Sequence, residues 1–157
     1  MTIRTARISD AEAICELINY YADRGRMLHR SLESTYDTLR EFLVAAADGA
    51  IVGCVSVDVI WADLAEIKSL AVRPDAHGKG IGSQLCRAAM NDARALGVRR
   101  LFALTYEQEF FGRQGFAVVD RQRLPEKVWR ECIACPKVDA CDEIAMILEL
   151  DPPGTKP

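Results

Sequence analysis

The sequence lacks the long apolar runs that membrane-spanning helices need. Its longest uncharged apolar stretches, 42–47 and 51–57, have the length of β-strands, whereas a membrane helix needs about 18 or more such residues. We therefore expect no contact with a membrane. Half of the 157 residues are hydrophobic and 27% are charged, as in ordinary globular proteins. A chain of this length fits a single domain.

The sequence also lacks an excess of positive charge. Twenty Lys and Arg residues stand against 23 Asp and Glu residues, which gives a formal net charge of -3. Because the phosphate backbone of nucleic acids attracts basic surfaces, this sign argues against nucleic acid as the main partner. Residues 1–4 carry neither the basic stretch nor the apolar run of a secretory signal. We therefore expect a cytoplasmic protein.

The chain mixes strand-like and helix-like segments. Apolar spacing and turn residues predict strands at 3–8, 42–47, 51–59, 64–72, 100–105, 116–119 and 144–150. They predict helices from Ser9, which forms a capping box with Glu12, to about Tyr21, and from Ser34 to about Glu41. Two further helices are predicted at 83–96, where Gly97 is the stop, and at 107–114. Asp48-Gly49 is a favoured hairpin turn. This order predicts an α/β or α+β fold with a mixed sheet.

A glycine-rich loop precedes the helix at 83–96. Gly78, Gly80 and Gly82 leave backbone N–H groups open, and the helix dipole adds partial positive charge there. Such a loop suits a pyrophosphate, although three glycines can also form only a tight strand-to-helix turn. The dinucleotide fingerprint needs a glycine where Ser83 stands, and a Walker loop needs a Lys-Ser/Thr end that is missing here. Both of those nucleotide-binding folds are disfavoured.

The loop and the strand before it carry a family resemblance. Residues 70–82, Leu-Ala-Val-Arg-Pro-Asp-Ala-His-Gly-Lys-Gly-Ile-Gly, closely resemble the acetyl-CoA-binding motif of the GNAT acetyltransferase superfamily. Residues 110–116, Phe-Phe-Gly-Arg-Gln-Gly-Phe, resemble its second motif at the right distance. The resemblance covers roughly 3–119. It implies a GNAT-like mixed, mostly antiparallel central sheet flanked by helices.

The same resemblance implies acetyl-CoA as co-substrate and assigns residues to it. The strand residues implied to lie along the pantetheine arm are Leu70, Ala71 and Val72. The loop residues implied to hold the pyrophosphate are His77, Gly78, Lys79, Gly80, Ile81, Gly82 and Ser83.

Two positions depart from the family pattern. His77 stands where the family usually has Arg or Gln, although an imidazole can still donate a hydrogen bond. Phe111 stands where many members carry a Tyr that protonates the departing thiolate. That role passes to Tyr106, to water, or to no group.

Acetyl transfer needs a base that takes a proton from the amine. Glu66 is the candidate, because the superfamily often places such a Glu on this strand. Simple alternation puts Glu66 on one face with Lys68, Leu70 and Val72. The alternative is a Glu66–Lys68 ion pair on a solvated face. The resemblance implies a backbone amide near 70–72 as the donor to the thioester oxygen.

A narrower resemblance concerns the acceptor. Residues 21–31, together with the strands at 65–72 and 101–105, resemble the acetyltransferase domain of N-acetylglutamate synthases in a short, stand-alone form. This implies an acidic amino acid, L-glutamate first, as in arginine biosynthesis. Arg30 is the candidate to hold a carboxylate by a bidentate fork. Lys68 and Thr105 are the other substrate-binding candidates, and Arg24 and Arg26 are weaker ones.

Three cysteines cluster outside these motifs. Cys132, Cys135 and Cys141 lie in an expected insertion at about 125–143, before a Pro-rich tail at 151–157. A zinc site usually has a second closely spaced pair of ligands, so free or disulfide-bonded thiols are favoured over zinc or an iron–sulfur site. We expect no metal. A further hypothesis is redox control of substrate access by these thiols.

The sequence thus predicts a GNAT N-acetyltransferase with acetyl-CoA and a small amine as its substrates. The resemblance also implies a homodimer, because many members of the family form dimers. Two alternatives stay open at this point. The acceptor can be another small amine or a protein N-terminus. Given Phe111 and His77, the domain can instead be a catalytically weak CoA-binding sensor.

Overall fold

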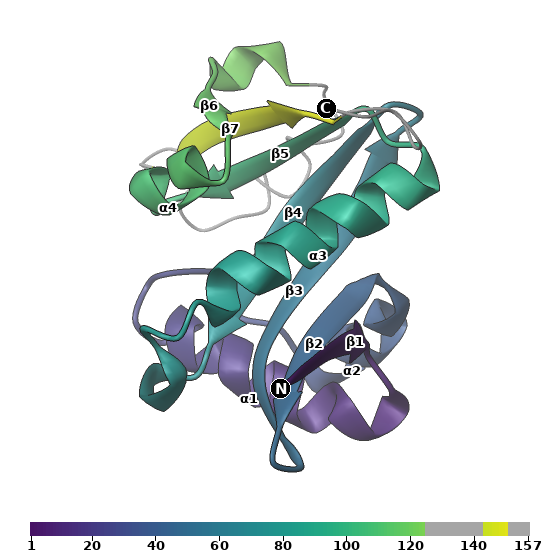
Figure 1. Ribbon diagram of the computed structural model, residues 1–157, viewed down its shortest axis with the longest axis vertical. Helices are drawn as coiled ribbons and strands as arrows, with labels where there is room; N and C mark the ends of the chain where they lie inside the picture. Colours follow the sequence, from purple (N-terminus) through teal and green to yellow (C-terminus); the bar gives the residue numbers. More distant parts are fainter. Residues whose placement is uncertain (125–142, 151–157) are drawn as a thin grey trace.

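The computed structural model describes residues 1–124 and 143–150 (Figure 1). Its strands are β1 (Thr2–Thr5), β2 (Phe42–Ala47), β3 (Ala50–Trp61), β4 (Leu64–Val72), β5 (Arg100–Thr105), β6 (Ala117–Val118) and β7 (Ile144–Glu149). Its α-helices are α1 (Ala11–Ala22), α2 (Leu32–Asp37), α3 (Ile81–Leu96) and α4 (Gln108–Arg113). The predicted mixture of strands and helices is confirmed.

The described strands form one seven-stranded sheet in the order β1-β2-β3-β4-β5-β7-β6. Every neighbouring pair is antiparallel except β4 and β5, which run parallel. The predicted mixed, mostly antiparallel sheet is therefore confirmed. The hairpin between β2 and β3 is also confirmed, because Asp48 and Gly49 both have positive φ, at 52° and 77°.

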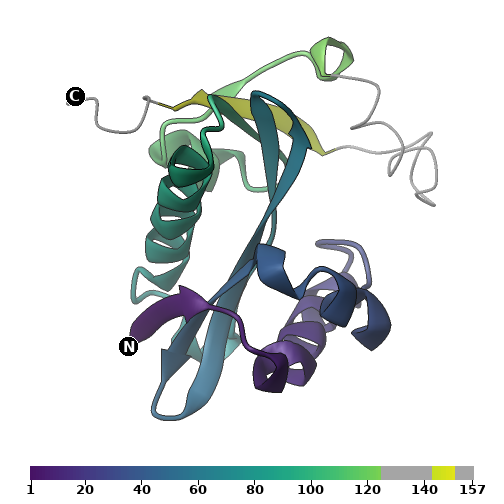
Figure 2. The same cartoon turned by 90° about the vertical axis from the view of Figure 1, so that its right-hand side faces the viewer.

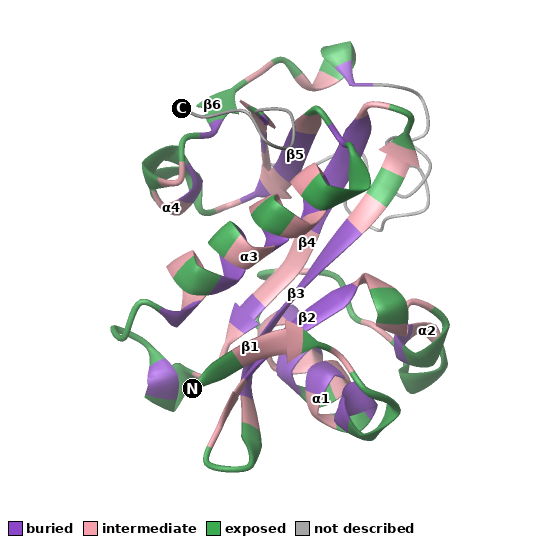
Figure 3. Ribbon diagram, turned by 45° about the vertical axis from the view of Figure 1, so that its right-hand side comes forward, coloured by how far each residue is buried: buried purple, intermediate pink, exposed green. Residues whose placement is uncertain are grey.

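Helices cover both faces of the sheet (Figure 2). Helix α3 packs Leu85, Ala89 and Ala93 against one face, and helix α1 packs Ile14 and Ile18 against the other. Because both faces are covered, the central strands read as continuous apolar runs. Figure 3 shows buried residues along the central strands and exposed residues on the outward side of α3.

The starts of the first two helices differ from the sequence prediction. The cap of helix α2 lies three residues earlier than expected, at Ser31 and not at Ser34: the Ser31 hydroxyl accepts the Ser34 N–H at 3.0 Å. Helix α1 begins at Ala11, after a 3₁₀ turn, so the capping box expected from Ser9 and Glu12 is wrong.

Asp10 organises that turn instead. Its carboxylate accepts the Arg7 backbone N–H at 2.8 Å and pairs with the Arg4 guanidinium at 2.7 Å. Asp10 is buried, and Arg4 lies on β1. A contact with a neighbouring strand therefore decides where the first helix starts.

Asp10→Ala should lower the free energy of unfolding by about 2 kcal/mol at pH 7, because a buried charge pair and a cap are lost together. The hydrogen bond from Arg4 holds the pKa of Asp10 below its ordinary value of 3.8. A depressed pKa contributes stability above the unfolded-state pKa, and this contribution is lost as the pH falls through the folded-state pKa. Urea unfolding at pH 7 and in acid measures the effect. The exposed Asp37→Ala is the control, and equal losses at both positions would contradict this account.

Candidate active site

A cleft opens where β4 and β5 separate. The ladder between these strands ends at the pair Glu66–Phe102, and beyond it the strands diverge (Figure 1). A cleft of about 1500 Å³ follows this opening. Its lining comes from β4, the end of β5, the loop between α1 and α2, and the glycine-rich loop ahead of α3. The separation of two parallel strands thus brings four distant parts of the chain to one site.

A β-bulge in β4 shapes the wall of this cleft. The register against β3 shifts between Cys54 and Ser56, and Ser69 adopts a positive φ of 55°. Ala65 and Ile67 before the bulge and Leu70 and Val72 after it pack on the α3 side. The expected common face for Glu66, Lys68, Leu70 and Val72 is therefore wrong, because the bulge reverses the alternation.

Glu66 lies in the cleft wall and is only 7% exposed. This burial does not fit the solvated sheet face that the alternative for Glu66 assumed, and the ion pair with Lys68 stays a prediction. Lys68 also lines the cleft, and its Nζ lies 3.1 Å from Oδ2 of Asp58 on β3. The Glu66 side chain thus lies where a small amine in the cleft can reach it.

Arg30 reaches the cleft from the loop between α1 and α2. Its guanidinium donates to the hydroxyl of Thr38 at 2.9 Å and to that of Ser69 at 3.4 Å, and it lies over the Phe42 ring. None of these three partners carries a charge. The positive charge of Arg30 can therefore meet an anion in the cleft.

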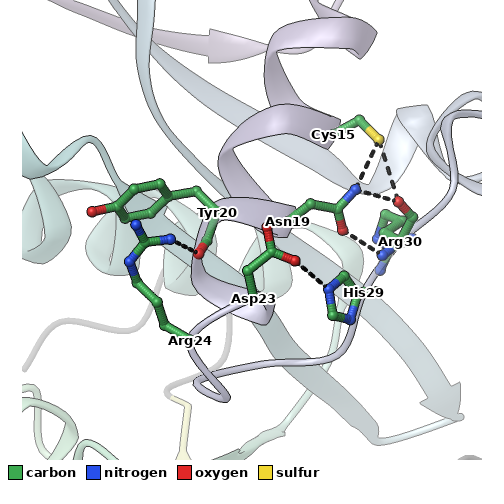
Figure 4. A network of polar contacts seen from close by, with 7 residues as sticks. All are labelled: Cys15, Asn19, Tyr20, Asp23, Arg24, His29 and Arg30. Atoms are coloured by element: carbon green, nitrogen blue, oxygen red, sulfur yellow. Dashed lines mark hydrogen bonds and ion pairs between the residues drawn. The ribbon is translucent and has the colours of Figure 1, made fainter.

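Arg24 and Arg26, the weaker candidates, lie differently. The Arg24 guanidinium stacks 3.5 Å from the centre of the Tyr20 ring and donates to the Tyr20 carbonyl (Figure 4). Arg24 does not line the cleft, whereas Arg26 does and forms an ion pair with Glu107. Arg26 therefore ties the α1–α2 loop to the segment after β5.

The glycine-rich loop fits the pyrophosphate expected from the sequence. Gly78 and Gly80 have φ of 80° and 76°, and no heavy atom lies within 4 Å of a Cβ built on either. A Cβ on Gly82 would lie 3.4 Å from the Phe110 ring. The backbone at the start of α3 is thus open to an anion. Of the predicted loop residues, all but Lys79 line the cleft, and Lys79 lines a smaller hollow of about 440 Å³.

His77 is exposed, and its imidazole lies beside the end of β4 at the same cleft. Its Nε2 lies 2.8 Å from the hydroxyl of Tyr21 and 3.0 Å from the carbonyl oxygen of Val72, to which Tyr21 also donates. Sequence reasoning assigned no role to Tyr21, although the residue opens the segment that resembles N-acetylglutamate synthases. Burial raises its pKa above the ordinary value.

The end of β5 completes the cleft. Thr105 and Tyr106 line it, and the Thr105 hydroxyl accepts the Glu107 backbone N–H at 2.8 Å. Phe111 is buried, and its ring packs against Phe110 and Phe116. Since Phe111 has no hydroxyl, Tyr106 is the phenol that the β5 end presents to the cleft.

The predictions for Cys132, Cys135 and Cys141 lie outside the described residues. The other three cysteines are free, and burial raises the pKa of Cys54 and of Cys86 to about 12. Within 1–124 and 143–150, no three His, Cys, Asp or Glu side chains gather as metal ligands. In the same part of the chain, no helix combines the length and apolar character of a membrane span.

Known proteins resemble the chain in sequence. Residues 9–116 match the acetyltransferase (GNAT) family. An uncharacterized N-acetyltransferase of Chlorobaculum tepidum is 41% identical over 94% of this chain and 96% of its own length. An amino-acid acetyltransferase of Mycobacterium tuberculosis is 38% identical over 82% of this chain and 75% of its own length.

A solved structure shares the fold. N-acetylglutamate synthase from Neisseria gonorrhoeae, complexed with coenzyme A and N-acetyl-glutamate, superimposes with a TM-score of 0.88 and 31% identity. The match covers 96% of this chain and 35% of that one. The predicted acetyltransferase class and the predicted acetyl-CoA co-substrate are thereby confirmed. This chain belongs to the GNAT family of acetyltransferases.

Proposed function

We propose that the protein transfers the acetyl group of acetyl-CoA to the α-amine of a small amino acid, with L-glutamate as the first candidate. One observation carries the proposal: the buried Glu66 and the Arg30 guanidinium both line the same cleft. The sequence similarity to an amino-acid acetyltransferase supports it. The cytoplasmic location and the homodimer stay predictions of the sequence.

Acetyl-CoA supplies the thioester carbonyl that the amine attacks. The open amides around Gly78, Gly80 and Gly82 would hold the pyrophosphate, and the edge of β4 at 70–72 would lie along the pantetheine arm. A backbone amide of the same edge would donate to the thioester oxygen as negative charge develops there. These groups would keep the reacting carbonyl near Glu66.

Glu66 would act as the general base. It accepts a proton from the ammonium group of the acceptor, directly or through one water, and leaves a nitrogen lone pair that forms the new C–N bond. The C–S bond then breaks, and the thiolate takes up a proton for which Tyr106 is the proposed donor. The second proton of the new amide nitrogen passes to water, and the Tyr106 phenolate takes up a proton from solvent. No acyl-enzyme forms, because the amine attacks the thioester itself.

Arg30 would select the acceptor by its carboxylate. A guanidinium binds a carboxylate through two parallel N–H bonds, which is stronger and more directional than a single contact. Lys68 and Thr105 line the same cleft and are proposed as additional acceptor contacts. An acceptor with an α-amine and a side-chain carboxylate therefore fits these groups.

The experiment incubates the purified protein with acetyl-CoA and each of several acceptors, and detects the acetylated product by mass. The acceptors are L-glutamate, L-glutamine, L-aspartate, a neutral amino acid and a short peptide with a free N-terminus. Detection by mass avoids thiol reagents, which would react with the free cysteines. We expect product from L-glutamate, with much lower yields from the neutral amino acid and the peptide.

Other outcomes would change the proposal in defined ways. Product from the peptide alone would reject the amino-acid acceptor and keep the chemistry. Measurable acetyl-CoA binding without product from any acceptor would favour the CoA-binding sensor.

A further inference from the structure

We propose that Asn19 is a positioning residue for the acceptor: its side-chain amide clamps the backbone of Arg30 to helix α1 and so holds the guanidinium in the cleft. The inference rests on the proposed role of Arg30 in binding the acceptor carboxylate. It adds a residue that does not itself line the cleft.

The Asn19 amide bonds both backbone groups of Arg30 (Figure 4). Its Oδ1 accepts the Arg30 N–H at 2.8 Å, and its Nδ2 donates to the Arg30 carbonyl at 2.8 Å. A planar amide is the side-chain group that offers a donor and an acceptor side by side, as a peptide does. Two bonds from one rigid group fix both the position and the direction of the Arg30 backbone.

Cys15 strengthens the same clamp from one turn earlier on α1. Its Sγ donates to the Arg30 carbonyl at 3.3 Å and accepts from Nδ2 of Asn19 at 3.4 Å. Residues four apart in a helix lie on one face, so Cys15 and Asn19 meet the loop together. The Arg30 carbonyl is thus held by two donors from a helix that packs on the sheet.

The clamp matters because Arg30 lies near the end of an exposed loop. The backbone of 23–26 is bonded to the C-terminal end of α1, and the chain attaches to α1 again at Arg30. From this anchor the guanidinium reaches Thr38 and Ser69 across the cleft wall. A bidentate contact with a carboxylate needs this geometry, since a displacement of about 1 Å can cost a factor of about 100.

The test compares Asn19→Ala and Asn19→Asp with the wild-type enzyme. Alanine removes both bonds while favouring the helix, and aspartate keeps the shape and one acceptor but loses the donor. We expect Asn19→Ala to raise the KM for L-glutamate about 10-fold, with kcat and the KM for acetyl-CoA changing less than about 2-fold. Asn91→Ala is the matched control, because Asn91 bonds Arg94 on the exposed side of α3.

The double variant Asn19→Ala/Arg30→Ala separates positioning from a general loss of structure. If Asn19 acts through Arg30, the double variant has the same acceptor KM as Arg30→Ala alone. Additive effects of the two changes would overturn the inference. So would an equal rise of both KM values in Asn19→Ala and Asn19→Asp, since that indicates a general distortion.

The single variants also separate this inference from the proposed function. A raised acceptor KM in Arg30→Ala combined with a normal one in both Asn19 variants rejects the inference alone. A normal acceptor KM in Arg30→Ala rejects the proposed carboxylate contact, and the role of Asn19 with it.

Discussion

Glu66→Gln is expected to lower kcat about 1000-fold and to leave the binding of acetyl-CoA close to the wild-type value. Glutamine has the size of glutamate and can keep its hydrogen bonds, but it cannot take a proton from the ammonium group. General-base catalysis contributes about 100-fold to 10,000-fold in enzymes. Because Glu66 is buried in the cleft wall, bulk water replaces it poorly.

Steady-state rates measured across a range of pH test this role. At each pH both substrates are saturating, so that the measured difference between the wild type and the variant lies in kcat and not in binding. Glu149→Gln makes the same chemical change on the exposed side of β7, outside the cleft, and is expected to retain the wild-type rate. A Glu66→Gln enzyme with more than about a tenth of the wild-type kcat would exclude Glu66 as the base.

Arg30→Ala is expected to raise the KM for L-glutamate about 100-fold. The loss of one partner of a desolvated charge pair typically costs several kcal/mol, and each 1.4 kcal/mol changes an equilibrium constant tenfold. The KM for acetyl-CoA should change little, because Arg30 lies at the α1–α2 side of the cleft and not in the glycine-rich loop. The loss should be much smaller for an acceptor without a side-chain carboxylate.

Two further variants sharpen this result. Arg30→Lys keeps the charge but cannot reach Thr38 and Ser69 with one planar group, so a rise of about 10-fold is expected. Arg24→Ala removes an arginine of the same loop that stacks on Tyr20 outside the cleft, and both KM values should stay normal. Equal effects of Arg24→Ala and Arg30→Ala on the KM for L-glutamate would show that the total charge of the loop, and not the position of Arg30, determines this KM.

Local chemistry explains why several elements could be predicted from the sequence. Strands β4 and β5 have the predicted bounds, since apolar runs between turn residues determine them. The turn at Asp48-Gly49 follows from the tolerance of these residues for positive φ. Gly97, with a φ of 90°, ends α3 as predicted.

Two predictions failed where a contact from outside the element decides its structure. Ser9 and Glu12 form a good local capping pattern, but the Asp10 carboxylate pairs with Arg4 on the neighbouring strand, and the helix begins after Asp10. Alternation along β4 failed at Ser69, where a bulge adds one residue against β3. Neither the pairing partner nor its register is visible in the segment itself.

By itself, the sequence determined the strands and helices, the glycine-rich loop and the resemblance to GNAT acetyltransferases, because these depend on residues close together in the chain. The tertiary structure alone decided the divergence of β4 and β5 beyond Glu66, the orientation of Glu66 across the bulge, and the clamp of Asn19 on Arg30. The first two features depend on register between strands, and the clamp depends on how the loop after α1 folds back on that helix. Such contacts form only when the whole sheet and its covering helices assemble.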